Sequence, residues 1–359
     1  MSYNIKVERV KESGISKIDF NNIQFGKIFS DHMFVTDYYD GEWRDARIVP
    51  FSNISIHPAT FALHYGQAIF EGLKAYRNSE GEIQVFRPEK NWERLNKSAF
   101  RMCMAEVPQE LFMKAIDLLI GIDKDWVPKI EGGSLYIRPF MFATDESVGI
   151  KPGDRFKFMI FSCPVATYYS APVKVLITDK YVRAVKGGVG AAKAAGNYAA
   201  TMYPVKLARE EGYDQILWTD PFEFRWVQEI GTMNVFFQFG DKTVATPTLE
   251  DGTILDGVTR NSLIDLLKRK GYTVEERRIS IDEIFEHHAN GTLKDAFGAG
   301  TAATVAPISV LGNRGKQYEI ADNPERLCYQ LKKELEDIRY GRVADTFNWM
   351  HKIEEPVLV

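Results

Sequence analysis

The chain has 359 residues, a formal net charge of −4 and a hydrophobic fraction of 45%, a composition ordinary for a globular protein. This length accommodates two domains, and the slightly acidic balance offers no basic surface for nucleic acid or an anionic membrane. The charged N-terminal stretch MSYNIKVERVKESG lacks the apolar core of a signal peptide, and no apolar run is long enough to cross a bilayer. Three widely spaced cysteines fit free thiols, so we expect a soluble cytoplasmic protein.

The first half of the chain predicts antiparallel strands mixed with helices. Alternating apolar residues and turn residues such as Asp40-Gly41 indicate hairpins, and helical periodicity begins after Pro88. The predicted elements are, in chain order, hairpins at 33–50 and 72–87, helices at 88–103 and 109–121, and strands at 134–144 and 156–165. This pattern predicts a smaller α+β domain over residues 1–165.

The segment CPVATYYSAP contains two prolines and predicts an interdomain linker, assigned to 166–176. Behind it, helices and strands alternate more regularly in a larger domain, 177–359. The predicted elements are strands at 173–179, 214–220 and 227–240, the last broken at Gly231, and helices at 203–212, 260–270, 282–290 and 324–341. Ser280 and Glu283 form a capping-box pattern. The expected fold class is α+β, with mixed α/β content and two domains.

Two stretches of small residues raise the alternative of a nucleotide-dependent enzyme. A P-loop needs Gly-Lys-Ser/Thr, but in GGVGAAKAAGNY (187–198) alanines flank Lys193 on both sides. GAGTAA (298–303) matches the dinucleotide pattern G-x-G-x-x-A, but Pro307 leaves too little room for the helix that should follow. The sequence therefore does not favour a nucleotide site.

Metal and serine-hydrolase chemistry are not favoured either. His287 and His288 are adjacent, so on a helix they point about 100° apart and do not easily share an ion. We expect them at an exposed helix end. The chain contains neither G-x-S-x-G nor H-E-x-x-H. No metal site is predicted.

Lys193 is the only charged residue between Gly187 and Val205. One interpretation is a mobile Gly/Ala loop with a solvated lysine. The other is a lysine kept for chemistry, whose small neighbours let a flat ligand approach the backbone. The residue types alone leave both open.

Further polar groups occur in apolar or small-residue surroundings. Glu229 lies within WVQEIGTMNVFF, where a strand would either expose it or bury it with a cationic partner. LDGVTR (255–260) precedes a predicted helix, and FGAGTAA (297–303) is a second loop of small residues. Both loops suit backbone N–H groups that point at a phosphate, and both also suit plain turns.

Considered together, these features suit pyridoxal 5′-phosphate. This cofactor needs a lysine amine for its aldehyde, a carboxylate for its ring nitrogen, and N–H groups with an arginine for its phosphate. The lysine must also act as a base, and desolvation among small apolar residues near a cation favours the neutral amine that this requires. The hypothesis is that Lys193 is isolated because its partner is a cofactor.

The order of nine separated motifs resembles that of the branched-chain-amino-acid aminotransferases, which are class IV (fold-type IV) pyridoxal-phosphate enzymes. The resemblance runs from about Phe25 to about Trp349, nearly the whole chain. The motifs are FGKIFSDHM, LHYGQAIFEGLKAYR, FRPEKNWERLNKSAFRM, DKDWVP, SLYIRP, GGVGAAKAAGNY, QEIGTMN, LDGVTRNSL and GAGTAA.

The resemblance implies the residues that hold the cofactor. Lys193 corresponds to the lysine that forms the Schiff base and later moves the proton between Cα and C4′. Glu229 corresponds to the acid that pairs with the pyridine nitrogen, and Tyr198 to the tyrosine that hydrogen-bonds the phenolic oxygen. The phosphate ligands correspond to Arg94, the backbone of Val258 and Thr259, and the backbone and hydroxyl of Thr301.

The resemblance also implies a substrate pocket and a homodimer. The aromatic walls correspond to Phe25, Tyr65, Phe70, Tyr136 and Tyr168. Thr232 and Ala302 correspond to the groups that receive the α-carboxylate, and Arg138 to the arginine thought to accept the second carboxylate of glutamate. Val148 and Ile150 correspond to a loop that reaches into the neighbouring subunit's pocket.

The implied reaction is the reversible transfer of the amino group of L-leucine, L-isoleucine or L-valine to 2-oxoglutarate, giving a branched 2-oxo acid and L-glutamate. The alternatives within the same fold type are a D-amino-acid transaminase and an aminodeoxychorismate lyase. The alternative of another class is the nucleotide-dependent enzyme described above.

Overall fold

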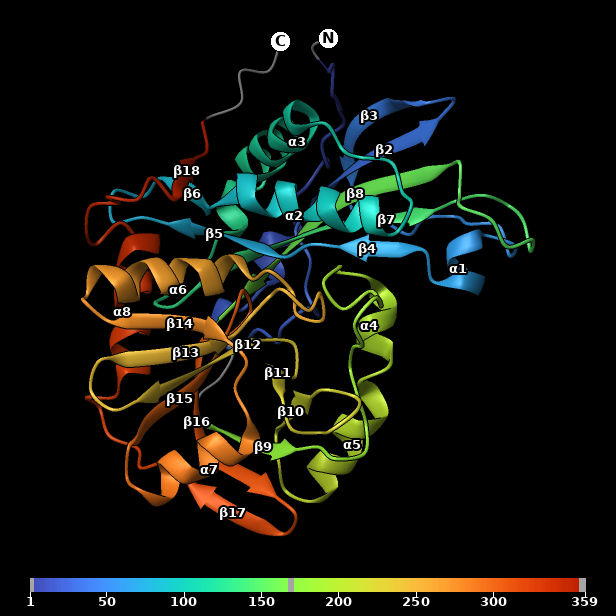
Figure 1. Cartoon of the computed structure of the whole chain (residues 1–359). Coiled ribbons are helices and arrows are strands. Elements are labelled where there is room, and N and C mark those ends of the chain that lie inside the picture. Colours follow the sequence, from blue (N-terminus) through green and yellow to red (C-terminus); the bar gives the residue numbers. More distant parts are fainter. Residues whose placement is uncertain (1–2, 167–170, 355–359) are drawn as a thin grey trace. The chain divides into compact units, whose positions relative to one another are not determined.

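The structure of the protein is a computed structural model that describes residues 3–166 and 171–354. By contact, these residues form two compact units, shown in Figure 1. Unit 1 contains residues 3–166, 192–195 and 337–354, and unit 2 contains residues 171–191 and 196–336. The predicted domains 1–165 and 177–359 stay a prediction, and they differ from the units in the assignment of two short segments, 192–195 and 337–354.

Unit 1 is built around a sheet in the order β1-β3-β2-β8-β7-β5-β6-β18, with β4 paired to β7. Within the residues described, its pairings are antiparallel except that of β1 with β3. The strands are β1 (Lys6–Val7), β2 (His32–Tyr39), β3 (Glu42–Pro50), β4 (Ala68–Phe70), β5 (Leu73–Arg77), β6 (Ile83–Phe86), β7 (Ser134–Ala143), β8 (Phe156–Val165) and β18 (Met350–Lys352).

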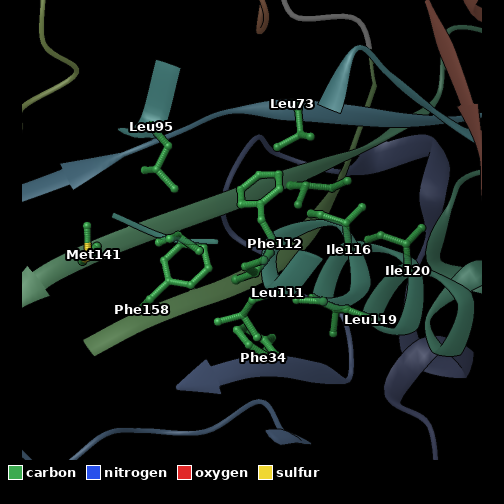
Figure 2. Close-up of a cluster of buried hydrophobic side chains, with 14 of the residues drawn as sticks. Phe34, Leu73, Leu95, Leu111, Phe112, Ile116, Leu119, Ile120, Met141 and Phe158 are labelled. Atoms are coloured by element: carbon green, nitrogen blue, oxygen red, sulfur yellow. The ribbon is translucent and has the colours of Figure 1, made fainter. Parts of the chain in front are cut away.

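The core of unit 1 lies between this sheet and its longer helices. They are α2 (Pro88–Arg101) and α3 (Gln109–Ile122), and a short helix, α1 (Phe61–Tyr65), precedes β4. In α3 apolar residues recur at helical spacing, so one face of the helix is continuously apolar and is buried. Figure 2 shows Phe112 and Ile116 of α3 beside Leu73 of β5, and all three side chains are buried. This packing holds α2 and α3 against the strands.

The predicted elements of the first half are confirmed. The hairpin β2–β3 turns at Asp40 and Gly41, whose φ angles of 53° and 81° suit the tight turn that joins twisted strands. Helices α2 and α3 differ from the predicted ranges by one or two residues at their ends. Helix α2 begins at Pro88, where the missing N–H costs no helical hydrogen bond.

An ion pair ties the C-terminal strand β18 to α3. His351 Nε2 lies 2.6 Å from Asp117 Oδ1, and this hydrogen bond raises the pKa of His351 above its usual 6.5 against the opposing effect of burial. A raised pKa in the folded state adds stability below pH 6.5, and this contribution is lost as the pH rises through the raised value.

His351→Gln is therefore expected to lower the free energy of unfolding more at about pH 6 than at about pH 9. Urea unfolding at both pH values measures the difference. The exposed His64, whose ring contacts the Pro58 carbonyl and no carboxylate that the structure describes, provides the control variant His64→Gln. Equal losses for His351→Gln at the two pH values would contradict the assignment.

Unit 2 is built around a second sheet, in the order β11-β10-β9-β16-β15-β12-β13-β14, with β17 paired to β16. The pairings β9–β10, β9–β16 and β13–β14 are parallel, so the sheet is mixed. The strands are β9 (Val173–Ile177), β10 (Gln215–Thr219), β11 (Val227–Ile230), β12 (Asn234–Phe239), β13 (Thr243–Pro247), β14 (Thr273–Arg277), β15 (Leu293–Gly300), β16 (Thr304–Asn313) and β17 (Lys316–Glu319).

Helices alternate with the strands along the chain in unit 2. They are α4 (Ala195–Ala199), α5 (Met202–Glu210), α6 (Val258–Arg269), α7 (Ile281–Ala289) and α8 (Leu327–Arg339), of which the first and last cross the boundary between the units in sequence. Helix α5 contacts β10, α6 contacts β14 and β15, and α7 contacts β15. The predicted capping box is confirmed in part, because Ser280 Oγ accepts the N–H of Glu283 at 3.1 Å. The α+β prediction is confirmed, and two strands at 227–240 meet near Gly231 as expected.

Strand β9 (Val173–Ile177) confirms the predicted strand at 173–179, because the alternating sequence VKVLI pairs in parallel with β10 and β16. The linker 166–176, which overlaps this strand, stays a prediction. Residues 167–170, which include Tyr168 of the predicted substrate wall, lie outside the described residues.

The structure excludes a dinucleotide loop at GAGTAA. Gly300 and Thr304 are paired across an antiparallel hairpin of β15 and β16, so a strand follows the loop where the fingerprint needs a helix. His287 and His288 lie in the last turn of α7, as expected, where they contact the Thr292 hydroxyl and the Glu319 carbonyl. The expectation that they are exposed is wrong, because both are half-buried and the ring of His287 stacks on Phe239. Over residues 3–166 and 171–354 no helix is long and apolar enough to cross a membrane, and no cluster of His, Cys, Asp and Glu suits a metal ion.

Candidate active site

Lys193 is fixed by its backbone within unit 1. Ala194 forms an antiparallel bridge with Ile69, and the Phe70 N–H donates to the Lys193 carbonyl at 3.1 Å. The Lys193 N–H donates to Ser98 Oγ of α2 at 2.9 Å. The segment 192–195 thus extends the edge of β4 and is anchored to a helix as well. These contacts favour the interpretation of an anchored lysine over that of a mobile loop.

The side chain of Lys193 faces an aromatic ring. Its Nζ lies 5.0 Å from the centre of the Phe70 ring, and the guanidinium of Arg138 lies 4.6 Å from the centre of the same ring. A ring face attracts both cations, and a half-buried position keeps water partly away from the amine. The amine is thus held in an aromatic and partly desolvated position.

Arg94 is held by a carboxylate that the sequence analysis missed. Its Nε and Nη2 contact Glu71 Oε1 and Oε2, both at 2.8 Å, in a bidentate ion pair. Asn91 Nδ2 donates to Glu71 Oε2 at 2.7 Å, and the Gly72 N–H donates to it at 3.1 Å. Glu71 is fully buried and Arg94 nearly so. The ion pair therefore fixes the guanidinium of Arg94 in one orientation.

The charge state of Glu71 follows from these partners. Burial alone raises the pKa of its carboxyl, but the charges and hydrogen bonds of Arg94, the charge of Lys193 and the amide of Asn91 outweigh burial. The pKa of Glu71 is consequently lowered from its usual 4.5. Glu71 is therefore a carboxylate at neutral pH, and it faces both predicted cofactor-binding cations.

The aromatic residues of the predicted substrate wall in unit 1 contact one another. The rings of Phe25 and Tyr136 meet edge to face with their centres 5.2 Å apart, and Arg138 Nη2 donates to the Tyr136 hydroxyl at 2.8 Å. Tyr136 packs so close to Gly72 that a Cβ there would lie 2.2 Å from its hydroxyl oxygen. Phe25, Phe70, Tyr136 and Arg138 thus form one cluster with Lys193.

Tyr65 and the loop residues Val148 and Ile150 form a separate, more exposed group. The Tyr65 hydroxyl donates to the Val148 carbonyl, which fixes the loop to α1. The side chains of Val148 and Ile150 are 68% and 85% exposed. Apolar side chains of this exposure are not part of the core of unit 1.

In unit 2, Glu229 is buried on β11 with a cationic partner. Its Oε2 lies 2.7 Å from Arg183 Nη2, and its Oε1 accepts the Leu255 N–H at 3.1 Å and Asn234 Nδ2 at 3.2 Å. Of the two outcomes left open by the sequence, burial with a cation is the one observed. Arg183 and Asn234 are further residues that the sequence analysis did not assign.

Helix α6 presents its N-terminus beside this carboxylate. Its N-cap is Gly257, which has no side chain to accept the first N–H groups, and Val258 and Thr259 form its first turn. A Cβ at Gly257 would lie 2.0 Å from Asn234 Oδ1, so the close approach requires glycine. Leu255, which bonds Glu229, lies three residues before Val258. Unit 2 therefore contains, close together, a carboxylate and a helix N-terminus suited to a phosphate.

The remaining predicted residues of unit 2 lie on helix α4 and on two turns. Tyr198 is in α4, whose Asn197 donates to the Val189 carbonyl at 2.8 Å. Thr232 lies in the turn between β11 and β12 and is exposed. Thr301 and Ala302 lie in the turn between β15 and β16.

The structure thus groups the predicted residues within two units. Lys193, Arg94 and most of the aromatic wall belong to unit 1; Glu229, Tyr198, α6 and both turns belong to unit 2. Glu71, Arg183 and Asn234 were missed. A signal existed for Glu71, since it interrupts the apolar run AIFEGL just as Glu229 interrupts its own. For Arg183 the sequence carries no such signal.

Comparison with known proteins gives matches over most of the chain. Residues 68–311 match the family model described as Amino-transferase class IV. Branched-chain-amino-acid transaminase 1 of Bacillus subtilis (strain 168) is 46% identical over 339 residues, which cover 93% of this chain and 95% of that protein. A probable branched-chain-amino-acid aminotransferase of Staphylococcus epidermidis is 43% identical over 362 residues, 99% of each chain.

A solved structure shares the fold. The branched-chain amino acid aminotransferase from Thermobaculum terrenum, crystallised in its PLP-form, superposes with a TM-score of 0.73 at 25% identity, covering 89% of this chain and 98% of that one.

The chain belongs to the class IV aminotransferases, because their family model spans more than half of it. Enzymes of this class use pyridoxal phosphate and act on amino and 2-oxo acids. Within the class, its near-full-length relatives place it among the branched-chain-amino-acid aminotransferases. The predicted family, fold type and aminotransferase activity are confirmed.

Proposed function

We propose that this protein transfers the amino group of L-leucine, L-isoleucine or L-valine to 2-oxoglutarate with pyridoxal 5′-phosphate as its cofactor. The observation that carries the proposal is the position of Lys193. A lysine in a stretch of glycine and alanine is anchored by two hydrogen bonds of its backbone and by the bridge of the neighbouring Ala194, and its amine lies over Phe70. The names of the full-length relatives support the choice of substrates.

The residues fit pyridoxal phosphate. Arg94 offers a guanidinium of fixed orientation for a phosphate, and α6 offers N–H groups behind a glycine N-cap that has no competing side chain. Glu229 offers a buried carboxylate for a ring nitrogen, and Tyr198 a hydroxyl for the phenolic oxygen. Thr301, in the turn after β15, is the further phosphate ligand that we propose.

When bound, pyridoxal phosphate supplies an aldehyde that condenses with amines and a ring that takes up an electron pair. Lys193 would hold the aldehyde, and its amine would be the base that moves the proton at the substrate Cα. Glu229 would hold a proton on the ring nitrogen, which would strengthen the ring as an electron acceptor. Phe70 keeps water from the amine on one side.

The proposed substrate pocket combines an apolar wall with one cation. Phe25, Phe70 and Tyr136, with Tyr65 and Tyr168, would contact the aliphatic side chain, and Arg138 would bind the second carboxylate of glutamate. Thr232 and Ala302 would receive the α-carboxylate. One methylene group changes the binding free energy by only about 1–3 kcal/mol in such a pocket, so all three branched amino acids should be accepted.

We also propose a homodimer in the cytoplasm. The exposed apolar side chains of Val148 and Ile150 support a second copy as the partner, and three unbonded thiols support a reducing compartment. Light scattering of the purified protein measures its mass, and a monomer would contradict the dimer.

The test of the proposed function is spectroscopic. The purified protein should be yellow, and L-leucine should change its visible absorbance, with recovery on addition of 2-oxoglutarate. A panel that contains D-leucine and 4-amino-4-deoxychorismate separates the related activities. Response to D-leucine alone, or a colourless protein stabilised by NAD, would contradict the proposal.

Gly72→Ala tests the substrate wall. The added Cβ would lie 2.2 Å from the Tyr136 hydroxyl oxygen, so the ring must move and lose its bond from Arg138. We expect KM for L-leucine to rise about 10-fold or more, a loss of roughly 1.4 kcal/mol, with little change in cofactor affinity. Gly14→Ala, whose Cβ would make only ordinary contacts, is the control. Unchanged KM values would remove Tyr136 from the pocket.

A further inference from the structure

The buried carboxylate of Glu229 is held by donors from three separate segments of unit 2. Arg183 contacts its Oε2 at 2.7 Å, whereas Leu255 N–H and Asn234 Nδ2 contact its Oε1 at 3.1 and 3.2 Å. The side chains of Arg183 and Glu229 are only 8% and 4% exposed. These donors fix both oxygens, so the plane of the carboxylate is determined before any ligand binds.

Arg183 also holds the segment that leads to α6. Its Nη2 donates to the Thr253 carbonyl and, at 3.3 Å, to the Gly190 carbonyl. The contacts of Arg183 therefore connect β11, through Glu229, to the residues before Leu255. A truncated side chain at position 183 would release the carboxylate and this segment at once.

Asn234 makes the corresponding connection from β12. Its Nδ2 donates both to Glu229 and to the Leu255 carbonyl, the latter at 2.9 Å. Its Oδ1 lies against Gly257, the N-cap of α6, where no Cβ fits. Asn234 thereby fixes the distance between Glu229 and the first N–H groups of α6.

We propose that Arg183 and Asn234 are positioning residues that join two ligand contacts, the carboxylate at Glu229 and the phosphate site at the start of α6, into one rigid group. The inference rests on the proposed function, because it assigns these contacts to the ring nitrogen and the phosphate of pyridoxal phosphate. Neither residue needs to touch the cofactor, since both act through Glu229 and through the segment 253–257.

The charge of Arg183 has a specific consequence. Removal of a neighbouring positive charge favours the protonated form of a buried carboxylate, because burial penalises its charged form. A neutral acid at position 229 no longer holds the proton of a ring nitrogen. Loss of Arg183 should therefore weaken cofactor binding most strongly at low pH, whereas a purely structural loss would weaken it equally at every pH.

The test measures the dissociation constant of pyridoxal phosphate by equilibrium dialysis, at about pH 6 and about pH 9, for wild type, Arg183→Met, Arg183→Lys and Asn234→Ala. We expect Arg183→Met to bind about 10- to 100-fold more weakly at the lower pH and to recover part of this loss at the higher pH. Arg183→Lys should restore much of the affinity. Arg314→Met, which removes an exposed arginine that pairs with Asp179, is the control.

Two further measurements separate the parts of the inference. In a Glu229→Gln background, Arg183→Met should raise the dissociation constant of pyridoxal phosphate by less than about 3-fold, because Arg183 acts through the carboxylate that this background lacks. In Asn234→Ala, inorganic phosphate should also compete less well with pyridoxal phosphate for binding, because the N-terminus of α6 is no longer held by Asn234. Circular dichroism identifies any variant that fails to fold, and Arg183→Lys then carries the test.

The outcomes are distinguishable from failure of the proposed function. A wild-type protein that binds no pyridoxal phosphate would refute the proposed function itself. A wild type that binds it, with Arg183→Met and Asn234→Ala binding equally well at both pH values, would overturn only the positioning role. A loss that is the same at both pH values would overturn the role of the Arg183 charge.

Discussion

Lys193→Ala is expected to abolish transamination and the visible absorbance of bound cofactor. Without the amine there is no covalent partner for the aldehyde and no base for the proton at the substrate Cα. The backbone contacts of residue 193 to Ser98 and Phe70 do not involve the side chain, so the variant should fold. Absorbance spectra and a coupled glutamate assay measure the two losses.

The matched control is Lys206→Ala. Lys206 is 70% exposed on α5 and lies 3.8 Å from Glu210, a surface pair of small energetic value. Its replacement should leave the spectrum and the rate unchanged. An unaltered visible spectrum in Lys193→Ala would remove Lys193 from its role.

Glu71→Gln is expected to lower the free energy of unfolding by about 3–5 kcal/mol, because it leaves the guanidinium of Arg94 buried without its counter-charge. Urea unfolding at neutral pH measures the loss. Glu93→Gln is the control, since Glu93 forms a half-exposed pair with Lys90 that contributes about 1 kcal/mol or less.

The effect of Glu71→Gln on the free energy of unfolding should depend on pH in the acidic range. Because the pKa of Glu71 is lowered in the folded state, its contribution is present above the usual value of 4.5 and is lost as the pH falls through the lowered value. The stabilities of wild type and Glu71→Gln should therefore begin to converge as the pH falls below 4.5. A constant difference down to about pH 2 would refute the ionised pair.

Local signals allowed much of the fold to be predicted. The turn at Asp40-Gly41 and the cap at Ser280 depend on neighbours a few residues apart, so the sequence contains the whole cause. Strand β9 was predicted at 173–179 from its alternating residues, whereas its parallel pairing with β16 was not, because that pairing joins residues far apart in sequence.

The candidate site was predictable only in part, for the same reason. Lys193 and Glu229 stood out by contrast with apolar neighbours. Their partners did not, because the contact of Glu71 with Arg94 spans 23 residues and that of Arg183 with Glu229 joins two distant segments. Such pairs exist only once the chain has folded, so a single sequence offers no direct pattern for them.

The two buried carboxylates have a common consequence for the protein without its cofactor. Glu71 meets its arginine inside unit 1, and Glu229 meets its arginine inside unit 2. Each of these two carboxylates is thus paired with a cation of its own unit, so release of pyridoxal phosphate leaves both ion pairs intact. We expect the protein without its cofactor to remain folded and to bind pyridoxal phosphate again.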